Sequence, residues 1–372
     1  MDKLVFNRSE APTLGVEIEL ALVDAQTMAL SSAIERVLAE VPLQYKHCIK
    51  PELMQCYLEI NSEICRTVAE AEDDMRAKIL AVQEIVDKND LRLLWSASHP
   101  FSLWRDQEIF RSERYKMLLE LLQDTARQLI TFGLHVHVGV DTGDKAVMIC
   151  DRIMQHLPVL LALSSNSPCW ENRVTGLHSN RAKVMEDLPT AGLPAQMRNW
   201  SEYTWLINHL VATGFINTIR EIWWDVRPHH NFGTVEIRIC DVPSTLDETM
   251  ALVAIIQCLV SALSDEIDEG TYQHNYHPMI VRQNKWRACR YGMEAELVDF
   301  YTYEARPVRE LVQNLVRWLE PKAAELDCTE YLLRNLEMAE NPSGAVRQLE
   351  MLKETNSPVE VVRRLTETSR LL

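Results

Sequence analysis

The sequence predicts an α+β protein, built from a β-sheet, covering helices and a helical C-terminal region. Four separate segments alternate apolar and polar residues with a period of two, as strands with one buried face do. Stretches between them repeat apolar residues at helical spacing. Past about Glu266 the period of two fades and the chain looks helical. We therefore expect a single domain over residues 1–372, with the sheet and its site within about 10–295 and a helical tail over about 296–372.

The first expected strand, Thr13–Val23, reads T-L-G-V-E-I-E-L-A-L-V. Its apolar residues share one face, and Glu17 and Glu19 lie together on the other, because side chains alternate along a strand. The other three strands repeat this pattern: Tyr57–Ser62 with Glu59 and Asn61, Phe132–Val140 with His135 and His137, and Gly233–Cys240 with Glu236 and Arg238.

Helices are expected where apolar residues recur every three or four positions. These stretches are Val68–Val86, Glu113–Ile130, Lys145–Leu157, Ser201–Ala212 and Thr245–Leu263. The segment Asp187–Asn199 contains two prolines and a glycine, which predicts a loop. In the tail, Ser357-Pro358-Val359-Glu360 is typical of a helix start, with a capping serine followed by proline.

Composition narrows the class of protein. A formal charge of -16 argues against a general nucleic-acid binder. The N-terminal residues lack an apolar signal core, and the uncharged run Ala251–Leu263 is too short to span a bilayer and is interrupted by Gln257. Nine cysteines without a C-x-x-C pair favour buried, reduced thiols. We expect a cytoplasmic protein that binds no membrane.

The polar faces of the four strands are unusual for a surface that only meets water. Such a face is common in antiparallel sheets, but it usually mixes Thr, Lys and Ser. Here nearly every side chain could bind a metal or a phosphate. Two carboxylates that lie two residues apart on a strand are separated by roughly 6.6 Å, and their repulsion costs about 2 kcal/mol. Divalent cations would relieve this repulsion, and carboxylates with few imidazoles suit Mg²⁺ or Mn²⁺.

Longer motifs resemble a known family. They are T-L-G-V-E-I-E-L, E-I-N-S-E-I-C, S-A-S-H-P-F, G-L-H-V-H-V-G, W-D-V-R-P-H-H-N-F-G-T-V-E-I-R-I-C-D-V-P-S-T-L and W-R-A-C-R-Y-G-M-E. In this order they resemble the carboxylate–amine ligase family, the type 2 glutamate–cysteine ligase-like proteins of the YbdK type. The resemblance runs from Thr13 to about Gly292, and the helical tail carries little of it.

The resemblance implies a glutamine-synthetase-like fold, in which a curved antiparallel sheet backed by helices holds the site on its open face. It implies ATP-dependent joining of a carboxylate to an amine through an acyl phosphate, with glutamate and cysteine as the named substrates. Arg238 would meet the transferred phosphoryl group, and Arg227 and Arg181 would bind the substrate carboxylate or the ATP phosphates. Mg²⁺ ions would be held by Glu17, Glu19, Glu59, His135 and Glu236. The chain contains neither a Walker A motif nor G-x-G-x-x-G, so a glycine-rich phosphate loop is not expected.

Neighbouring residues are secondary candidates for the site. Glu52 and Glu63 could join the acidic cluster, although solvated glutamates fit each better. His229 is expected in an exposed loop. The loop after Pro168 carries Val174 and Leu177 where family members more often have Asp and an aromatic residue, so we expect it to shape the amino-acid pocket and to alter the choice of substrate.

Three functions stay open at this point. The first is the ATP- and Mg²⁺-dependent ligase, with small-molecule substrates and, by family analogy, a homodimer. The second is a metal-dependent hydrolase of the amidohydrolase type, because His135-Val136-His137 has a metal-ligating spacing. The third is a non-catalytic binder that kept the fold.

Overall fold

The computed structural model describes residues 4–9, 12–271 and 276–371. Its centre is a seven-stranded sheet with the order β10-β11-β5-β1-β3-β2, in which β4 also pairs with β1. Every pairing in this sheet is antiparallel, as expected. The strands are β1 (Leu14–Asp24), β2 (Ile49–Pro51), β3 (Tyr57–Asn61), β4 (Leu91–Leu94), β5 (Gly133–Gly139), β10 (Val226–His229) and β11 (Thr234–Asp241).

Each of the four strands expected from alternation is present, as β1, β3, β5 and β11. The apolar face of β1 is fully buried, with Leu14, Val16 and Ile18 at most 1% exposed. The helices that cover this face include α2 (Val68–Lys88), α5 (Gly143–Ile153), α6 (Leu157–Ser164) and α9 (Leu246–Asp268). Burial of this apolar face against helices is what turns the opposite, polar face toward the open side of the sheet.

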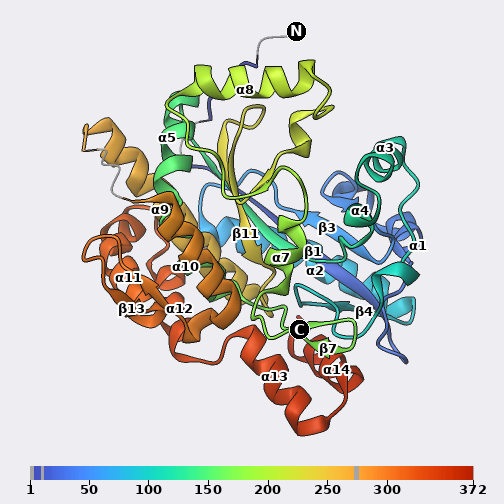
Figure 1. The fold of residues 1–372 in the computed structure, drawn as a ribbon. Helices are drawn as coiled ribbons and strands as arrows, with labels where there is room; N and C mark the ends of the chain where they lie inside the picture. The colour runs from blue at the N-terminus through green and yellow to red at the C-terminus, as the bar shows by residue number, and fades with distance from the viewer. Residues whose placement is uncertain (1–3, 10–11, 272–275, 372) are drawn as a thin grey trace.

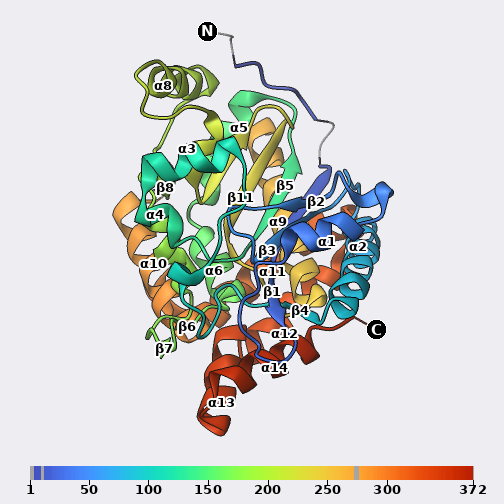
Figure 2. The ribbon, with the colours of Figure 1, turned by 90° about the vertical axis from the view of Figure 1, so that its right-hand side faces the viewer.

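The remaining helices surround this centre. In Figures 1 and 2, α8 lies at one end of the molecule and α13 and α14 at the other. The hydrophobic core continues into the tail, and α14 contacts β4. These helices are α1 (Ile34–Glu40), α3 (Glu113–Leu122), α4 (Asp124–Arg127), α7 (Asn180–Glu186), α8 (Trp200–Ala212), α10 (Pro278–Tyr291), α11 (Val308–Glu325), α12 (Thr329–Glu340), α13 (Gly344–Thr355) and α14 (Pro358–Thr368).

Two of the expected helices are each divided in the structure. The stretch Glu113–Ile130 forms α3 and α4, because Gln123 adopts a left-handed backbone angle (φ 52°) that ends the first helix. The expected helix Lys145–Leu157 ends at Ile153, and α6 begins at Leu157 after a bend of 67°. Pro158 lies in the first turn of α6, where the missing N–H of proline is tolerated.

Short elements complete the chain. Within the helical tail, β12 (Glu296–Val298) pairs with β13 (Ala305–Pro307), which the tail's helical pattern did not predict. The expected loop Asp187–Asn199 is irregular, apart from β8 (Ala191–Gly192), which pairs with β9 (Trp223–Trp224). The expected start of the last helix is confirmed, since the Ser357 hydroxyl accepts the backbone N–H of Glu360.

Helix α9 is longer than the apolar run from which it was predicted. By length and composition alone its 23 residues could cross a membrane, so the run is not too short on that test. However, 72% of its apolar window is buried inside the protein, which is the environment of a core helix. All nine cysteines are buried free thiols, as expected.

A glycine sets the hairpin between β10 and β11. Gly233 has a left-handed backbone angle (φ 66°), and a Cβ there would lie 1.8 Å from the Asn7 carbonyl oxygen. Only glycine satisfies both conditions without strain. This turn fixes the register that places Arg227 directly opposite Glu236.

Candidate active site

A cavity of about 440 Å³ opens on the polar face of the sheet. Its floor comes from six strands, and its walls come from α3, α7 and the segments around Leu129 and Arg220. All eight residues that the sequence singled out for metal, phosphate or substrate binding line this one cavity: Glu17, Glu19, Glu59, His135, Arg181, Arg227, Glu236 and Arg238. The predicted convergence of separate strands is therefore present in the structure.

The strand register explains why these side chains meet. Residues directly opposite one another across antiparallel strands have Cβ atoms about 5 Å apart and share one face. Three cross-strand pairs form the centre of the site: Glu17 with His135, Glu19 with Glu59, and Glu236 with His137. The site is thus a consequence of sheet pairing, with side chains supplied at every second position.

One group of three side chains has the arrangement of a metal site. Glu17, His135 and Glu236 each offer a ligand atom, and these atoms all lie within 4.8 Å of one another. His135 Nδ1 is 3.3 Å from Glu17 Oε2, and His137 Nε2 is 3.4 Å from Glu17 Oε1. His137 itself is held by a hydrogen bond between its Nδ1 and the Thr234 hydroxyl, at 2.9 Å.

The charges around this group are largely balanced. Burial alone would raise the pKa of Glu17, but hydrogen bonds to His135 and His137 outweigh it and hold the pKa well below its usual range. Burial, with Arg238 nearby, lowers the pKa of His135 to about 4, so its imidazole is neutral at physiological pH. A neutral imidazole beside an ionised carboxylate is the state in which both groups coordinate a metal.

Negative charge accumulates on the other side of the cavity, at β1, β3 and the end of β2. Burial, reinforced by Glu59, raises the pKa of Glu19 to about 7. Burial and the charge of Glu17 raise the pKa of Glu59, although Lys50 lies 3.9 Å away. Glu52 is half-buried here, and its pKa is raised well above the usual range by partial burial and by its neighbours Glu59 and Glu19. Three carboxyl groups with raised pKa values in one cavity form a site that a cation would stabilise.

Two arginines are anchored by one carboxylate. Arg227 donates from Nε to Glu236 Oε2 at 2.6 Å, and its Nη1 donates to the Ile222 carbonyl oxygen at 2.6 Å. Arg238 donates to the other oxygen of Glu236. Burial alone would raise the pKa of Glu236, but Arg227 and Arg238 outweigh it and keep the pKa well below its usual range. Both guanidinium groups are therefore held at the cavity in fixed positions.

Arg181 is placed differently. It is 3% exposed and donates to the carbonyl oxygens of Ile239 and Arg238, each at 3.3 Å. Its guanidinium lies against Gly133, where a Cβ would come within 2.2 Å of NH2. Arg181 thus reaches the cavity through a contact that requires glycine on β5.

Several expectations about neighbouring residues were wrong. Glu52 is half-buried and lines the cavity with Glu19 and Glu59, because it comes directly after the end of β2. His229 lines the cavity at the end of β10, where its ring stacks on Phe232 with centroids 4.2 Å apart. The loop with Val174 and Leu177 does not line the cavity, and Val174 is 52% exposed.

One neighbouring residue is placed as expected, and two arginines of the cavity were not singled out from the sequence. Glu63 is solvated, with 56% of its side chain exposed. Arg114 and Arg220 line the cavity, and sequence reasoning missed both because they come from α3 and from the short 3-10 helix Ile219–Glu221 rather than from the sheet. Positive charge at the rim of an acidic cavity is suited to anionic parts of a substrate.

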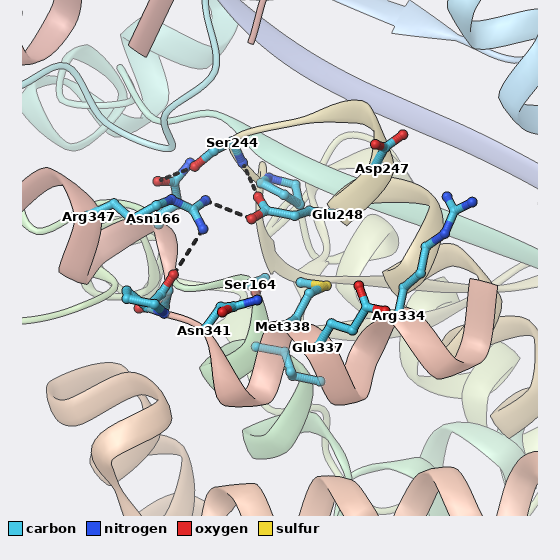
Figure 3. Close-up of a pocket in the computed structure, with 15 residues that line it drawn as sticks. Ser164, Asn166, Ser244, Asp247, Glu248, Arg334, Glu337, Met338, Asn341 and Arg347 are labelled. Carbon is cyan, nitrogen blue, oxygen red and sulfur yellow. Dashed lines mark hydrogen bonds and ion pairs between the residues drawn. The ribbon is translucent and has the colours of Figure 1, made fainter. Parts of the chain in front are cut away.

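A second cavity, of about 360 Å³, lies between the start of α9 and helices α12 and α13 (Figure 3). Its central charges are already paired: Arg347 lies 2.7 Å from Glu248, which also accepts the backbone N–H of Ser244 at 3.0 Å. None of the residues singled out from the sequence lines this cavity. The cavity on the sheet is therefore the better candidate for the active site.

Comparison with known proteins agrees with the resemblance seen in the sequence motifs. The family model described as glutamate–cysteine ligase family 2 matches residues 13–368. The chain belongs to glutamate–cysteine ligase family 2. A Gloeobacter violaceus protein provisionally named glutamate–cysteine ligase 2 is 42% identical over 359 residues, which cover 96% of each chain. A Leifsonia xyli protein with the same provisional name is 39% identical over 374 residues, covering 100% of this chain and 99% of the relative.

Solved structures support the fold. A glutamate–cysteine ligase from Francisella tularensis in complex with AMP matches with a TM-score of 0.72 at 12% identity, covering 98% of this chain and 90% of the other. A bifunctional glutathione synthetase from Pasteurella multocida matches with a TM-score of 0.69 at 12% identity, covering 96% of this chain and 52% of the other. The expected fold of a glutamate–cysteine ligase is confirmed, and the family supports an ATP-dependent carboxylate–amine ligase.

Proposed function

We propose that this protein joins the carboxylate of an amino acid to an amine through an acyl phosphate, with release of ADP and phosphate. Glutamate and cysteine are the substrates to test first, giving γ-glutamylcysteine. The observation that carries this proposal is the single cavity in which β1, β3, β5 and β11 place carboxylates and imidazole, while β10 and β11 each present one arginine. The family to which the chain belongs agrees with it.

The residues fit divalent metal ions. Glu17, His135 and Glu236 bring their ligand atoms within 4.8 Å of one another, and Glu19, Glu52 and Glu59 add carboxyl groups whose ionisation is opposed by burial. Oxygen-rich sites of this kind suit Mg²⁺ or Mn²⁺. When bound, such ions would neutralise the ATP phosphates beside the acidic sheet. The proposed ligands are Glu17, Glu19, Glu59, His135 and Glu236.

Arg238 is the proposed partner of the phosphoryl group during transfer. Its guanidinium lies in the cavity and bonds to one oxygen of Glu236. A guanidinium has five N–H donors, so others can bind a phosphate oxygen. Arg227 is fixed from two sides, by Glu236 and by the Ile222 carbonyl oxygen. We assign it the binding of a substrate carboxylate or phosphate without a change of position. Pre-organised donors of this kind stabilise charge that develops during phosphoryl transfer.

The cavity walls provide the shielding that an acyl phosphate needs. An activated carboxylate must meet the amine before water reaches it, so the reacting groups have to be enclosed. Leu118 of α3, together with Trp223 and Phe232, supplies apolar surface around the polar floor. Arg181 would complete the phosphate or carboxylate contacts. The cytoplasmic location and the homodimer expected by family analogy are part of the same proposal.

The amidohydrolase alternative is less consistent with the site. His135 and His137 do face the same cavity, but His137 is held by Thr234 and is flanked by Glu17 and Glu236. The pKa of His137 is raised, because these two carboxylates outweigh the lowering effect of burial. The cavity around the pair is rich in carboxylates, which suits Mg²⁺ or Mn²⁺ better than the histidine-dominated ligand set of a zinc hydrolase.

Hydroxylamine provides a direct test of the reaction type. With Mg-ATP and glutamate, hydroxylamine would replace the amine and trap the acyl phosphate as a hydroxamate. We expect hydroxamate and ADP to form in equal amounts, and cysteine to compete with the trapping. ADP without hydroxamate, or no nucleotide turnover with any pairing of amino acid and amine, would contradict the proposal.

A further inference from the structure

A second cluster of metal-ligating side chains lies outside the catalytic cavity. His47, Cys48 and Glu63 each offer one ligand atom, and these atoms all lie within 4.8 Å of one another. The His47 Nε2 atom is 2.6 Å from Glu63 Oε1, and the Cys48 sulfur is 3.2 Å from the same oxygen. None of the three lines the cavity on the sheet. We propose that this cluster is a separate binding site for a thiophilic divalent ion of the Zn²⁺ class.

The ligand types distinguish this site from the catalytic one. A thiolate and an imidazole select zinc-like ions over Mg²⁺, which prefers oxygen ligands. The carboxylate of Glu63 would be the third ligand and water the fourth, in the tetrahedral arrangement that zinc adopts. The Cys48 thiol would release its proton to solvent as the sulfur–metal bond forms.

The geometry allows an ion to enter with small movements. The side chains of His47 and Glu63 are 63% and 56% exposed, so both can move apart and water can reach the open position. Cys48 is buried and its backbone carbonyl accepts the N–H of Asn61 at 2.9 Å, so its backbone is held while the two exposed ligands can adjust. Two adjustable ligands around one fixed ligand can reach the zinc–ligand distances of roughly 2.0–2.3 Å.

One neighbouring cation limits the affinity. The amine of Lys78 is 4.0 Å from Glu63 Oε1, and it also bonds to Asp74 and to the Asn61 carbonyl oxygen. Its positive charge opposes a divalent ion, while Asp74 offsets part of that charge. We therefore assign the site to reversible binding rather than to a permanent structural ion.

The site lies at the open end of the β2–β3 hairpin. Cys48 immediately precedes β2, and Glu63 follows shortly after β3. This hairpin carries Lys50 and Glu59 into the catalytic cavity. An ion joining Cys48 to Glu63 would therefore restrain the edge strand that forms one side of the active site.

Cobalt(II) alone, added to the full chain with thiols kept reduced, provides a specific probe. Thiolate–cobalt charge transfer absorbs in the near ultraviolet, and no cysteine lines the catalytic cavity, so metal bound in that cavity does not give the band. We expect the band in the wild-type protein and in Glu17→Gln, and we expect Zn²⁺ to displace it. The Cys48→Ser variant should lose the band, whereas Cys65→Ser, a nearby buried thiol outside the cluster, should keep it.

A second variant tests the site without altering a buried thiol. His47→Asn changes an exposed side chain, so folding should be preserved, and the Co²⁺ affinity should fall roughly tenfold or more. An absent band in the wild type, a band that survives in Cys48→Ser, or an unchanged affinity in His47→Asn would each overturn the proposal. Loss of the band in Cys65→Ser, with Cys48→Ser unaffected, would do the same.

Discussion

Replacing Glu19 with glutamine should stabilise the metal-free protein while removing its activity. Glu19 lies directly opposite Glu59 across β1 and β3, and Glu52 shares the same end of the cavity. Its carboxylate accepts the backbone N–H of Gly133 at 2.5 Å, a bond that a glutamine oxygen can also accept. The Glu19→Gln change therefore removes charge and keeps the hydrogen bond.

The magnitude follows from the pKa of Glu19. Burial and Glu59 raise this pKa from 4.5 to about 7, and each pH unit corresponds to about 1.4 kcal/mol. Because the folded protein binds the proton more tightly, stability falls as pH rises from 4.5 to 7, and the full cost is present above pH 7. At pH 8 the ionised carboxylate thus costs about 3 kcal/mol. Allowing for structural relaxation, we expect Glu19→Gln to gain about 1–3 kcal/mol.

Denaturant unfolding at pH 8 in a chelator measures this difference. Glu350→Gln, on the exposed side of α13, is the matched control and should leave stability unchanged. The same Glu19→Gln protein should lose most of its Mg-ATP-dependent phosphate release. If it unfolds at the same or lower denaturant concentration than the wild type in chelator, crowding of carboxylates in the cavity is not a real cost, and the reasoning fails.

Three other substitutions test further contacts. Gly133→Ala should displace the Arg181 guanidinium, because the new Cβ would lie 2.2 Å from its Nη2 atom. The variant should therefore have a higher KM for ATP or for glutamate. An unchanged KM for both would show that Arg181 binds neither. Gly233→Ala should destabilise the fold through its left-handed turn and the nearby Asn7 carbonyl, which thermal unfolding would detect. Burial lowers the pKa of His99 to about 3, so stability from this residue falls as pH drops below 6.5, by about 2 kcal/mol at pH 5. In His99→Asn the free energy of unfolding should change less between pH 5 and 7 than in the wild type. An equal change in both proteins would contradict this prediction.

The sequence predicted the long strands well because alternation is strong where one face is buried. The short strands were missed for physical reasons. β2 has three residues, too few to show a period, and β10 contains Pro228, which weakens a strand pattern. The breaks at Gln123 and before Leu157 depend on local backbone angles, which apolar spacing does not report.

The sequence predicted which residues line the cavity, but not which of their side chains bond to one another. Glu17, Glu59 and Glu236 could be assigned to one cavity because each lies on the polar face of a strand. That Arg227 and Arg238 share Glu236 depends on the β10–β11 register, which the turn at Gly233 sets. Glu52 was considered for the acidic cluster but expected in solvent, because it follows a strand too short to recognise.

Phosphate release by wild-type protein and by Glu17→Gln, with Mg-ATP, glutamate and cysteine, tests the central claim most directly. Glu17 contacts the rings of His135 and His137 at 3.3 and 3.4 Å, so the change removes one proposed metal ligand at the centre of the site. We expect the wild type to release phosphate only when both amino acids are present, and the variant to be slower by roughly 100-fold or more. A variant that releases phosphate at the wild-type rate would contradict the claim that these converging carboxylates and imidazoles hold the metal ions of the reaction.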